Sequence, residues 1–550
     1  MTALIIHGAT LRTMTADAVK DIPVHHDADE AGRPTAVAVA DGRITAVGTD
    51  DEVLALADTD TELIDARGAV LTPGLIDSHM HPVWGAELTA GIDLGGLTTL
   101  DQVRAAISAA AAELPDDAWI RGWNLDYKPF GDEIRGDLFD EAAGGRPVAL
   151  VLMDLHTGVG NEAALRAAGI DGTEVFTDAS LVVVDDAGRP TGELREIPAY
   201  MMLIDAAPAL SRADAVDRVR AALRDSAASG VTTAAVMDGR EATLEVLDDV
   251  EAAPGGLPVR LQIALWHQPG DDDADVERRI ARLGAGGARY EVSMIKMFID
   301  GVIDSGTAWL HAPDTEGESE HPFWPSIGRY QEVAGRYREA GFQLATHSCG
   351  DAGAAAAART YAALGPRTAD GAPHRIEHLE TLTDDDVALI AQTGTVASMQ
   401  PLHMQWREAD HSDSWARRLG PERAGHAFRV RDLLSAGAHI CLGSDWPVAQ
   451  SDARIGMAWA RLRRRPGDPD APVFEPDQRL TGAETLLAHT RWAAEAIGRP
   501  DLGVIAVGAR ADLTLWEQDP VTTDPDHLPD TRVLLTLIDG TISHREEDIS

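Results

Sequence analysis

The sequence predicts an α/β protein: a (β/α)8 TIM-like barrel, a β-sandwich domain formed from both termini, and an α+β insertion after the first barrel strand. Three patterns indicate this fold. Eight short apolar runs follow one another along the chain, and helical patterns separate most of them. Both chain ends instead alternate short strands with glycine turns. The interval after the first run is far longer than one crossover helix needs.

The eight runs are the expected barrel strands. They cover residues 69–76, 231–237, 259–265, 294–299, 343–347, 375–379, 396–400 and 440–444. One intervening helix is expected to begin at the N-cap Ser211 and to stop at Gly230. Another is expected after Thr383, with aspartates in its first turn. The carboxyl ends of barrel strands meet on one face, so side chains at these ends are expected to share one site.

The remaining segments suggest how the chain divides into domains. We expect residues 1–69 and 500–550 to form one composite β-sandwich, because chain termini often lie close together. Residues 70–83 and 209–499 are expected to form the barrel. Residues 84–208 carry helix, strand and hairpin patterns of their own, and we expect them to form an insertion that covers the barrel mouth.

Composition narrows the class of partner and compartment. The 550 residues carry a formal net charge of −43, with 90 acidic against 47 basic residues. This charge would repel nucleic acid and anionic membrane surfaces, so neither is expected as a partner. Two cysteines, Cys349 and Cys441, make no disulfide framework and suit a reducing compartment. There is no signal-peptide pattern and no membrane-spanning apolar run, so a cytoplasmic location is expected.

Six side chains with metal-site chemistry stand at the ends of predicted barrel strands. They are His79, His81, Lys296, His347, His378 and Asp445. Alternate residues of a strand project to the same side, so the His-x-His pair can aim two imidazoles at one point. Imidazole and carboxylate are ligands of zinc. Two histidines with an aspartate could hold one divalent cation, and two further histidines a second. Alone, the His-x-His pair would equally fit two surface histidines.

Lys296 and Asp445 leave more than one role open. A charged ammonium beside a divalent cation would be repelled, so Lys296 is neutral, turned away, or converted to a carbamate that bridges two metals. The alternative is a salt bridge to Asp300. Asp445 could ligate the metal and also carry a proton from the attacking water to the leaving group. The alternative for Asp445 is an N-cap in the SDWP segment.

The chain resembles the amidohydrolase superfamily, and within it the YtcJ-like or family-3 amidohydrolases that include N-substituted formamide deformylases. The motifs that carry the resemblance, in order, are PGLIDSHMHP, KMFIDG, SGTA, HSCGDAG, RIEHLE, SMQP, GSDWPV and GVIAVGARADLTLWEQDP. The resemblance implies one or two divalent metal ions, with zinc expected, held by the six strand-end residues above. It also implies Asp445 as the proton carrier and a carbamate on Lys296.

The insertion carries motifs of the same family, namely RGWN, TGELRE and the segment around His156. The sequence departs from the family pattern at Asn124, which replaces an aspartate, and at Leu155, which replaces the glycine of a D-G-H motif. These positions are expected to face substrate. We therefore predict Trp123, His156 and Gln400, the last at the end of the seventh strand, as substrate-binding residues; the alternatives are packing within the insertion and a polar strand end.

These features predict a metal-dependent hydrolase that cleaves non-peptide carbon–nitrogen bonds of a small-molecule substrate, such as an amide or formamide, with a metal-activated water and Asp445 as proton shuttle. One alternative is a cyclic amidase or a deaminase on the same site. Others are a decarboxylase or isomerase, or a non-catalytic regulatory or binding protein on the same scaffold. A homodimer is common for such scaffolds.

Overall fold

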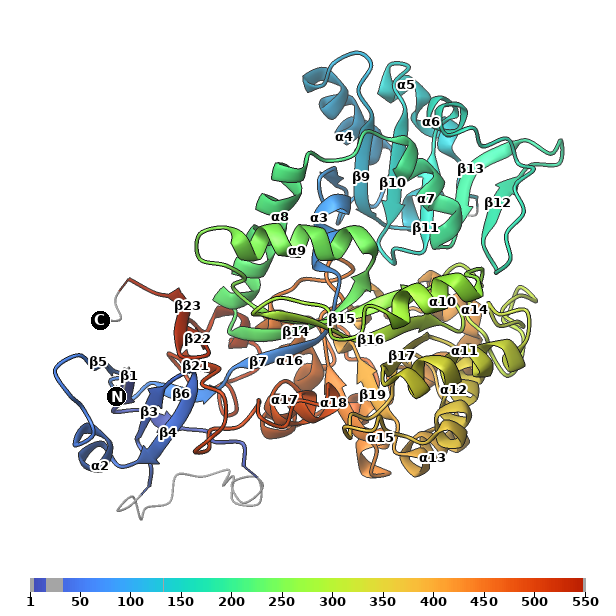
Figure 1. Ribbon diagram of the computed structural model, residues 1–550. Coiled ribbons are helices and arrows are strands. Elements are labelled where there is room, and N and C mark those ends of the chain that lie inside the picture. Colours follow the sequence, from blue (N-terminus) through green and yellow to red (C-terminus); the bar gives the residue numbers. More distant parts are fainter. Residues whose placement is uncertain (1–3, 16–32, 132, 548–550) are drawn as a thin grey trace.

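The structure, a computed structural model, describes residues 4–15, 33–131 and 133–547. Four sheets organise these residues: one barrel sheet, two terminal sheets and one sheet in the insertion. Figure 1 shows elements from both chain ends lying together at one side of the barrel, with the insertion at another side. Within the described ranges, none of the helices combines the length with the apolar character that crossing a lipid bilayer requires.

The barrel consists of eight parallel strands that pair in chain order. They are β7 (Leu75–Met80), β14 (Val231–Gly239), β15 (Arg260–His267), β16 (Tyr290–Phe298), β17 (Gln343–Ser348), β18 (Arg375–His378), β19 (Val396–Met399) and β20 (His439–Leu442). The segment after β20 meets β7 where the Asp445 N–H donates to the His79 carbonyl at 2.7 Å and the His81 N–H donates to the Trp446 carbonyl at 2.8 Å. The predicted TIM-like barrel is therefore confirmed.

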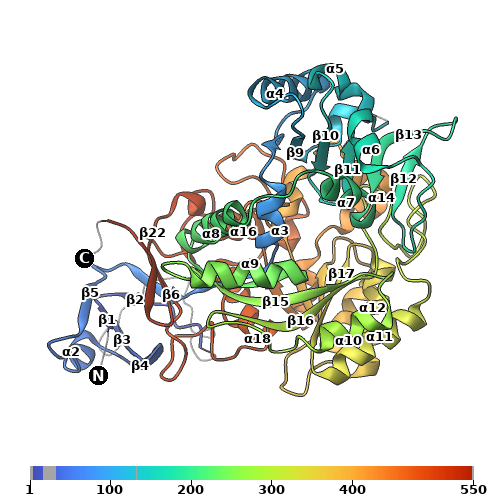
Figure 2. The same ribbon diagram turned by 45° about the horizontal axis from the view of Figure 1, so that its top comes forward.

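Helices cover the outside of the barrel sheet, as Figure 2 makes plain for α8 to α12. The barrel helices are α3 (Pro82–Leu88), α8 (Arg212–Ala228), α9 (Glu241–Ala252), α10 (Asp273–Ile280), α11 (Ile327–Ala340), α12 (Asp351–Leu364), α13 (Asp384–Thr393), α14 (Ser414–Arg423), α15 (Val430–Ser435), α16 (Ala453–Leu462), α17 (Gly482–Ala488) and α18 (Arg491–Ala496). Both predicted caps form: the Ser211 side chain accepts from the Asp214 N–H, and the Thr383 side chain accepts from the Asp386 N–H.

The terminal domain is a pair of sheets that share one apolar core. One sheet contains β1 (Leu4–His7), β3 (Ala36–Ala40), β4 (Arg43–Gly48) and β5 (Glu62–Asp65), with α2 (Asp50–Leu54) beside it; the other contains β2 (Thr10–Leu11), β6 (Val70–Pro73), β21 (Leu513–Trp516), β22 (Val533–Ile538) and β23 (Thr541–Arg545). The predicted sandwich from both termini is confirmed.

The expected first barrel strand, residues 69–76, is wrong in its bounds. Its first half is β6, which pairs antiparallel with β21 in the terminal domain. The change of sheet falls at Gly74, whose N–H donates to the Asp512 carbonyl at 2.8 Å, whereas the next N–H, of Leu75, donates to the Gly230 carbonyl at 3.0 Å. An apolar run cannot reveal this change, because both halves are buried β-strands.

The insertion after β7 and α3 has a six-stranded sheet with helices packed on it. Its elements are β8 (Ile92–Asp93), α4 (Leu100–Glu113), β9 (Ile120–Leu125), α5 (Asp140–Ala143), β10 (Val148–Leu152), β11 (Thr157–Gly160), α6 (Glu162–Ala168), β12 (Leu181–Val184), β13 (Pro190–Arg195) and α7 (Ile197–Ala206). The β10–β11 loop turns toward the barrel, and it brings residues 153–156 to the cavities at the barrel mouth. The α+β insertion after the first barrel strand is confirmed.

Candidate metal centre at the barrel mouth

His79 and His81 leave β7 on the same side, as the strand alternation predicts. Both are buried, and their ring centroids lie 5.2 Å apart. His79 Nδ1 donates to Glu377 Oε2 at 2.7 Å, which leaves Nε2 as the nitrogen that faces the centre. A carboxylate that orients a histidine in this way is the usual support of a metal ligand. Glu377 is itself fixed by Arg375, whose Nε donates at 2.6 Å.

Asp445 lies between the histidines of different strands. Its Oδ1 is 3.0 Å from His81 Nε2 and 3.4 Å from His79 Nε2. Its Oδ2 is 3.6 Å from His378 Nδ1 and also 3.6 Å from His403 Nε2. Two sets of possible ligands result, His79–His81–Asp445 and His378–His403–Asp445, each with its donor atoms within 4.8 Å of one another. Both sets contain the Asp445 carboxylate, which could therefore contact two cations.

The backbone around Asp445 is held in place by the β7 motif. Asp77 Oδ1 accepts the N–H groups of His79 and Ser444, and Asp77 Oδ2 accepts the Ser444 hydroxyl at 2.6 Å. Gly443 is required because a Cβ there would lie 2.5 Å from the His79 nitrogen. Asp445 has φ of 59° and His378 has φ of 77°, a conformation that non-glycine residues rarely adopt and that is found where function demands it.

The electrostatics of this cluster suit a bound cation. Burial, together with the charge of Lys296, lowers the pKa of His79 to about 4, so its imidazole is neutral and free to act as a ligand. Burial opposes ionisation of Asp445, yet the surrounding imidazoles hold the pKa of Asp445 well below its usual range. Buried Asp445 Oδ1 and His403 Nε2 have no hydrogen bond of good geometry in the described part of the chain. Buried oxygen and nitrogen atoms that lack a hydrogen-bond partner could instead act as ligands of a divalent metal ion.

Lys296 reaches the same cluster from β16. Its side chain is buried, and its Nζ lies 3.5 Å from His79 Nε2 and 5.3 Å from the Phe298 ring centroid. The alternative of a salt bridge to Asp300 is wrong for this structure. The Asp300 carboxylate instead accepts the N–H groups of Cys349, Gly350 and Trp309, and no ion pair between Lys296 and Asp300 is found among the described residues.

His347 and His378 stand at the ends of β17 and β18, with ring centroids 4.4 Å apart. His347 Nε2 donates to the Gly301 carbonyl at 3.1 Å, so its Nδ1 is the nitrogen left for a ligand role. His347 is in neither set of ligand atoms that surrounds Asp445. Burial keeps the pKa of both imidazoles well below the usual range, which makes both neutral. Metal binding by all six residues stays a prediction.

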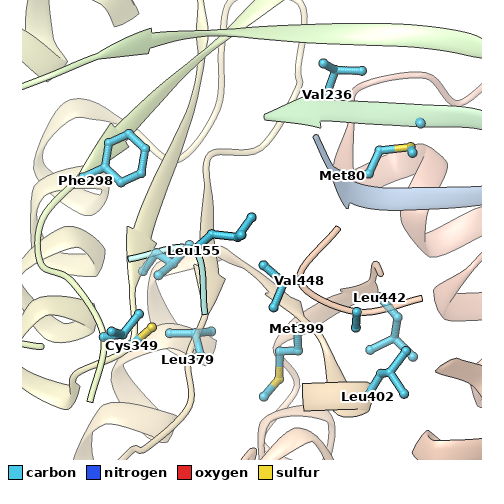
Figure 3. Close-up of a cluster of buried hydrophobic side chains, with 14 of the residues drawn as sticks. Met80, Leu155, Val236, Phe298, Cys349, Leu379, Met399, Leu402, Leu442 and Val448 are labelled. Carbon is cyan, nitrogen blue, oxygen red and sulfur yellow. The ribbon is translucent and has the colours of Figure 1, made fainter. Parts of the chain in front are cut away.

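The insertion contributes side chains directly to this site. Figure 3 shows Leu155, from the β10–β11 loop, among Phe298, Leu379 and Val448 of the barrel. The next residue, His156, has its ring centroid 4.9 Å from that of His347. His156 Nδ1 is 2.6 Å from Glu196 Oε2, and this pair raises the pKa of His156 even though burial opposes it. The insertion therefore places Leu155 and His156 beside the barrel histidines, and its covering of the whole barrel mouth stays a prediction.

The three predicted substrate-binding residues have different positions. His156 lines the cavities beside the cluster. Trp123 lies half-buried on β9, and it is not among the described residues that line either cavity. Gln400 is fully buried at the end of β19, and neither its amide nitrogen nor its oxygen has a hydrogen-bond partner among the described residues. Substrate binding by these residues stays a prediction.

His403 is a candidate that sequence analysis missed. It lies in the 3₁₀ turn Pro401–Trp406 that follows β19, and its ring stacks on His378 with centroids 6.3 Å apart. The available signal was a polar residue close behind a predicted strand end, in the segment SMQPLH. His403 lies three residues beyond the predicted strand end at Gln400, outside the strand-end positions on which the site prediction rests.

The cavities near the cluster differ in size and in lining. The small cavity, of about 60 Å³, is lined by His347, His378, His403 and Asp445 together with loop residues. A larger one, of about 620 Å³, lies between the insertion and α10 and contains none of the predicted metal ligands. A third space, of about 30 Å³, lies beside His81 and Lys296. Trp266 and Ile197 line both this space and the large cavity, so these two side chains separate the large cavity from the cluster. Asp445 lines both the cavity of about 60 Å³ and the space of about 30 Å³ beside His81 and Lys296, so chemistry at Asp445 is possible in either.

Comparison with known proteins identifies the family of this chain. The family model of the amidohydrolase family matches residues 62–544. YtcJ of Bacillus subtilis is 28% identical over 538 residues, which cover 94% of this chain and 97% of that protein. The N-substituted formamide deformylase of Arthrobacter pascens is 27% identical over 537 residues, 92% of this chain and 94% of that protein.

The fold has a close match among solved structures. An uncharacterized metal-dependent hydrolase from Pyrococcus horikoshii superimposes with a TM-score of 0.72 at 19% identity, covering 95% of this chain and 99% of that one. This likeness concerns the fold alone, whereas the family model extends over most of the sequence. The chain therefore belongs to the amidohydrolase family.

Proposed function

We propose that this protein hydrolyses non-peptide carbon–nitrogen bonds of small molecules, with N-substituted formamides and other small amides as substrates. The observation that carries the proposal is Asp445, a buried carboxylate placed between two pairs of histidines and facing a cavity. No lysine or arginine forms an ion pair with it among the described residues. The relative from Arthrobacter pascens, named for deformylation of N-substituted formamides, supports the same reaction class.

The donor set supports a centre of one or two divalent ions. His79, His81 and Asp445 would hold one ion; His347, His378 and Lys296 as a carbamate are proposed for a second, which His403 is placed to join. Imidazole and carboxylate donors favour zinc. Such ions, when bound, lower the pKa of water and polarise a carbonyl oxygen.

The reaction these residues support is the addition of water to an amide carbonyl. The water oxygen bonds to the carbonyl carbon, the carbon–nitrogen bond breaks, and the nitrogen leaves as an amine after it takes a proton. Asp445 is the proposed carrier, because its carboxylate is ionised and lies between the proposed metal ligands, where it can accept the proton of water. Glu377 orients His79 throughout, and the buried side chains of Leu155 and Val448 keep bulk water away.

An activity screen tests this proposal. Zinc-loaded protein is expected to release formate or a carboxylic acid from N-formyl and N-acyl amines, detected together with the free amine. Chelation should abolish the release and added zinc should restore it. A His79→Asn variant, which removes one proposed ligand, should lose both activity and bound metal. Full activity in thoroughly metal-free protein would contradict the proposal.

We further propose that Lys296 forms a carbamate. The Lys296 amine has no carboxylate partner in the described part of the chain, and burial lowers its pKa to about 8. A neutral amine adds carbon dioxide, losing one proton and gaining a carboxylate that can bridge two ions. In protein loaded with zinc and carbon-13 bicarbonate near pH 8, a carbamate carbon signal is expected in NMR spectra. The signal should be absent from the Lys296→Ala variant. If the protein with Lys296 in place also lacks the signal, the carbamate assignment is wrong.

A further inference from the structure

The space beside His81 and Lys296, which we call the inner space, is closed by large apolar side chains. All of them are buried: Trp84, Leu155, Ile197, Trp266, Phe298 and Val448. The volume of the inner space is about 30 Å³. A cavity needs about 10–15 Å³ to hold one water molecule, so the inner space has room for an attacking water and little else. A substrate group that enters it must therefore be small.

The position of Asp445 determines which part of an amide meets the inner space. Asp445 lines both the inner space and the small cavity of about 60 Å³. An amide carbonyl carbon bears two substituents, the nitrogen and the acyl group. With this carbon beside Asp445, the two substituents point in different directions, and the smaller space takes the smaller one. In a formamide the acyl substituent is a single hydrogen atom.

Leu155 joins the wall of the inner space in a backbone conformation that favours glycine. Its φ is 58°, in the left-handed region that glycine adopts without a steric penalty. Figure 3 shows its side chain among Phe298, Leu379 and Val448 of the barrel. A residue with a side chain in this conformation is uncommon, and such residues gather at ligand-binding sites. The side chain of Leu155 therefore calls for a functional explanation.

Hydrogen bonds on both sides of Leu155 hold the loop in this conformation. The Tyr200 hydroxyl donates to the Leu155 carbonyl at 2.7 Å, and the Leu155 N–H donates to the Leu152 carbonyl at 3.1 Å. At the next residue, the Glu196 N–H donates to the His156 carbonyl at 2.6 Å. The backbone is thus fixed independently of the leucine side chain, and that side chain is directed at the inner space.

The aromatic residues of the wall pack on one another. The ring centroids of Trp84 and Trp266 lie 5.3 Å apart, and those of Trp266 and Phe298 lie 5.6 Å apart, both in edge-to-face geometry. Trp266 also separates the inner space from the large cavity. These rings are therefore part of the barrel packing, whereas Leu155 can be shortened without breaking the aromatic cluster.

We propose that Leu155 restricts the acyl part of the substrate to a formyl group, so that the enzyme selects N-substituted formamides over longer amides. Leu155 is the specificity-determining residue, because its side chain occupies the volume that a methyl group or a longer acyl chain needs. The proposal rests on the proposed hydrolysis at Asp445 and names the residue that limits its substrates.

Leu155→Gly tests the proposal, because glycine suits a φ of 58° and removes the whole side chain. Zinc-loaded protein is assayed with N-butylformamide, N-butylacetamide and N-butylbutanamide. Formamides are intrinsically more reactive than acetamides, so the quantity compared between the two proteins is the acetamide-to-formamide ratio of kcat/KM. This ratio is expected to rise about 10- to 200-fold in the variant, the usual effect of one methylene in an apolar pocket. The butanamide-to-formamide ratio should rise as well, and unchanged ratios would overturn the proposal.

Two further variants locate the effect. Leu155→Ala keeps a Cβ and should raise the acetamide-to-formamide ratio about 10-fold. It decides the question if circular dichroism shows that Leu155→Gly does not fold. Leu194→Ala is the matched control, because Leu194 is a fully buried leucine of the insertion that lines neither the inner space nor the small cavity. It should leave the ratio unchanged. An equal rise in Leu194→Ala would show a general loosening of the site and contradict the assignment.

The nitrogen side of the substrate gives a check on orientation. N-methylformamide and N-butylformamide differ only in the group on nitrogen. The ratio of their kcat/KM values is expected to be the same in Leu155→Gly as in the unmodified protein. If this ratio changes while the acetamide-to-formamide ratio does not, the inner space holds the nitrogen substituent, and the proposal is wrong.

Binding separates this inference from the proposed function. Formohydroxamate, acetohydroxamate and butanohydroxamate bind zinc through the same two oxygen atoms and differ in the acyl group. In isothermal titration of zinc-loaded protein, formohydroxamate should bind most tightly, and Leu155→Gly should reduce this preference about 10-fold or more. If no amide is hydrolysed but the preference and its loss are observed, the size limit stands and the proposed reaction fails. If all three bind alike to the unmodified protein, the size limit fails whatever the turnover.

Discussion

Replacing Asp445 with asparagine is expected to lower kcat/KM by about 10²- to 10⁴-fold, the range that a general acid–base residue contributes. Asparagine keeps the shape of the side chain and one oxygen toward the imidazoles, but it cannot accept and return a proton. Because Asp445 also completes both sets of ligand atoms, a lower metal content is expected as well. Steady-state kinetics with zinc-saturated protein and metal analysis measure the two effects.

The control is Asp385→Asn, which makes the same chemical change on the exposed first turn of α13. It should leave kcat/KM within about twofold, as surface substitutions usually do. If Asp445→Asn retains near-normal turnover with its metal bound, the proton passes through another group, and the assignment of Asp445 as carrier is wrong.

Replacing Glu377 with glutamine is expected to destabilise the barrel by about 3–5 kcal/mol, the usual cost of breaking a buried ion pair on one side. Glu377 and Arg375 are both fully buried, with Arg375 Nε donating to Glu377 Oε1 at 2.6 Å. Burial opposes the charge on Glu377, but Arg375 and the His79 hydrogen bond hold the pKa of Glu377 well below its usual range. Glutamine would leave Arg375 charged and unpaired. Urea unfolding of the metal-free protein measures the loss.

The same variant should weaken metal binding by about 10- to 100-fold, because the partner that orients His79 loses its charge. The double variant Arg375→Met with Glu377→Gln is the control for stability. It removes both charges, so it should be less destabilised than Glu377→Gln alone. A single variant that unfolds at the same urea concentration as the unmodified protein would show that this pair contributes nothing to stability.

Much of the fold was predictable because it depends on local patterns. Buried barrel strands are apolar runs, and caps such as Ser211 and Thr383 act on their own helices. The error at residues 69–76 has a physical origin. Both β6 and β7 are buried strands, and only their partners, β21 for the first and β14 for the second, distinguish one domain from the other. A pairing partner distant in sequence leaves no local trace.

Part of the candidate site could also be predicted from the sequence, and part could not. His79 and His81 could be placed together from strand alternation, and Lys296, His347, His378 and Asp445 from their positions at strand ends. The surroundings of Lys296 could not, because Asp300 lies four residues away in the sequence and left an ion pair open as the alternative to a metal role. In the fold the Asp300 carboxylate accepts hydrogen bonds from three backbone N–H groups.

The sequence alone determined the barrel, the terminal sandwich and the order in which possible ligands reach one rim, because these follow from side-chain periodicity along single strands. Only the tertiary structure decided what surrounds them. It placed His403 beside Asp445, brought Leu155 and His156 over the mouth, and left Trp123 outside the small cavity. Those contacts join segments far apart in the chain, and packing between the insertion and the barrel sets them.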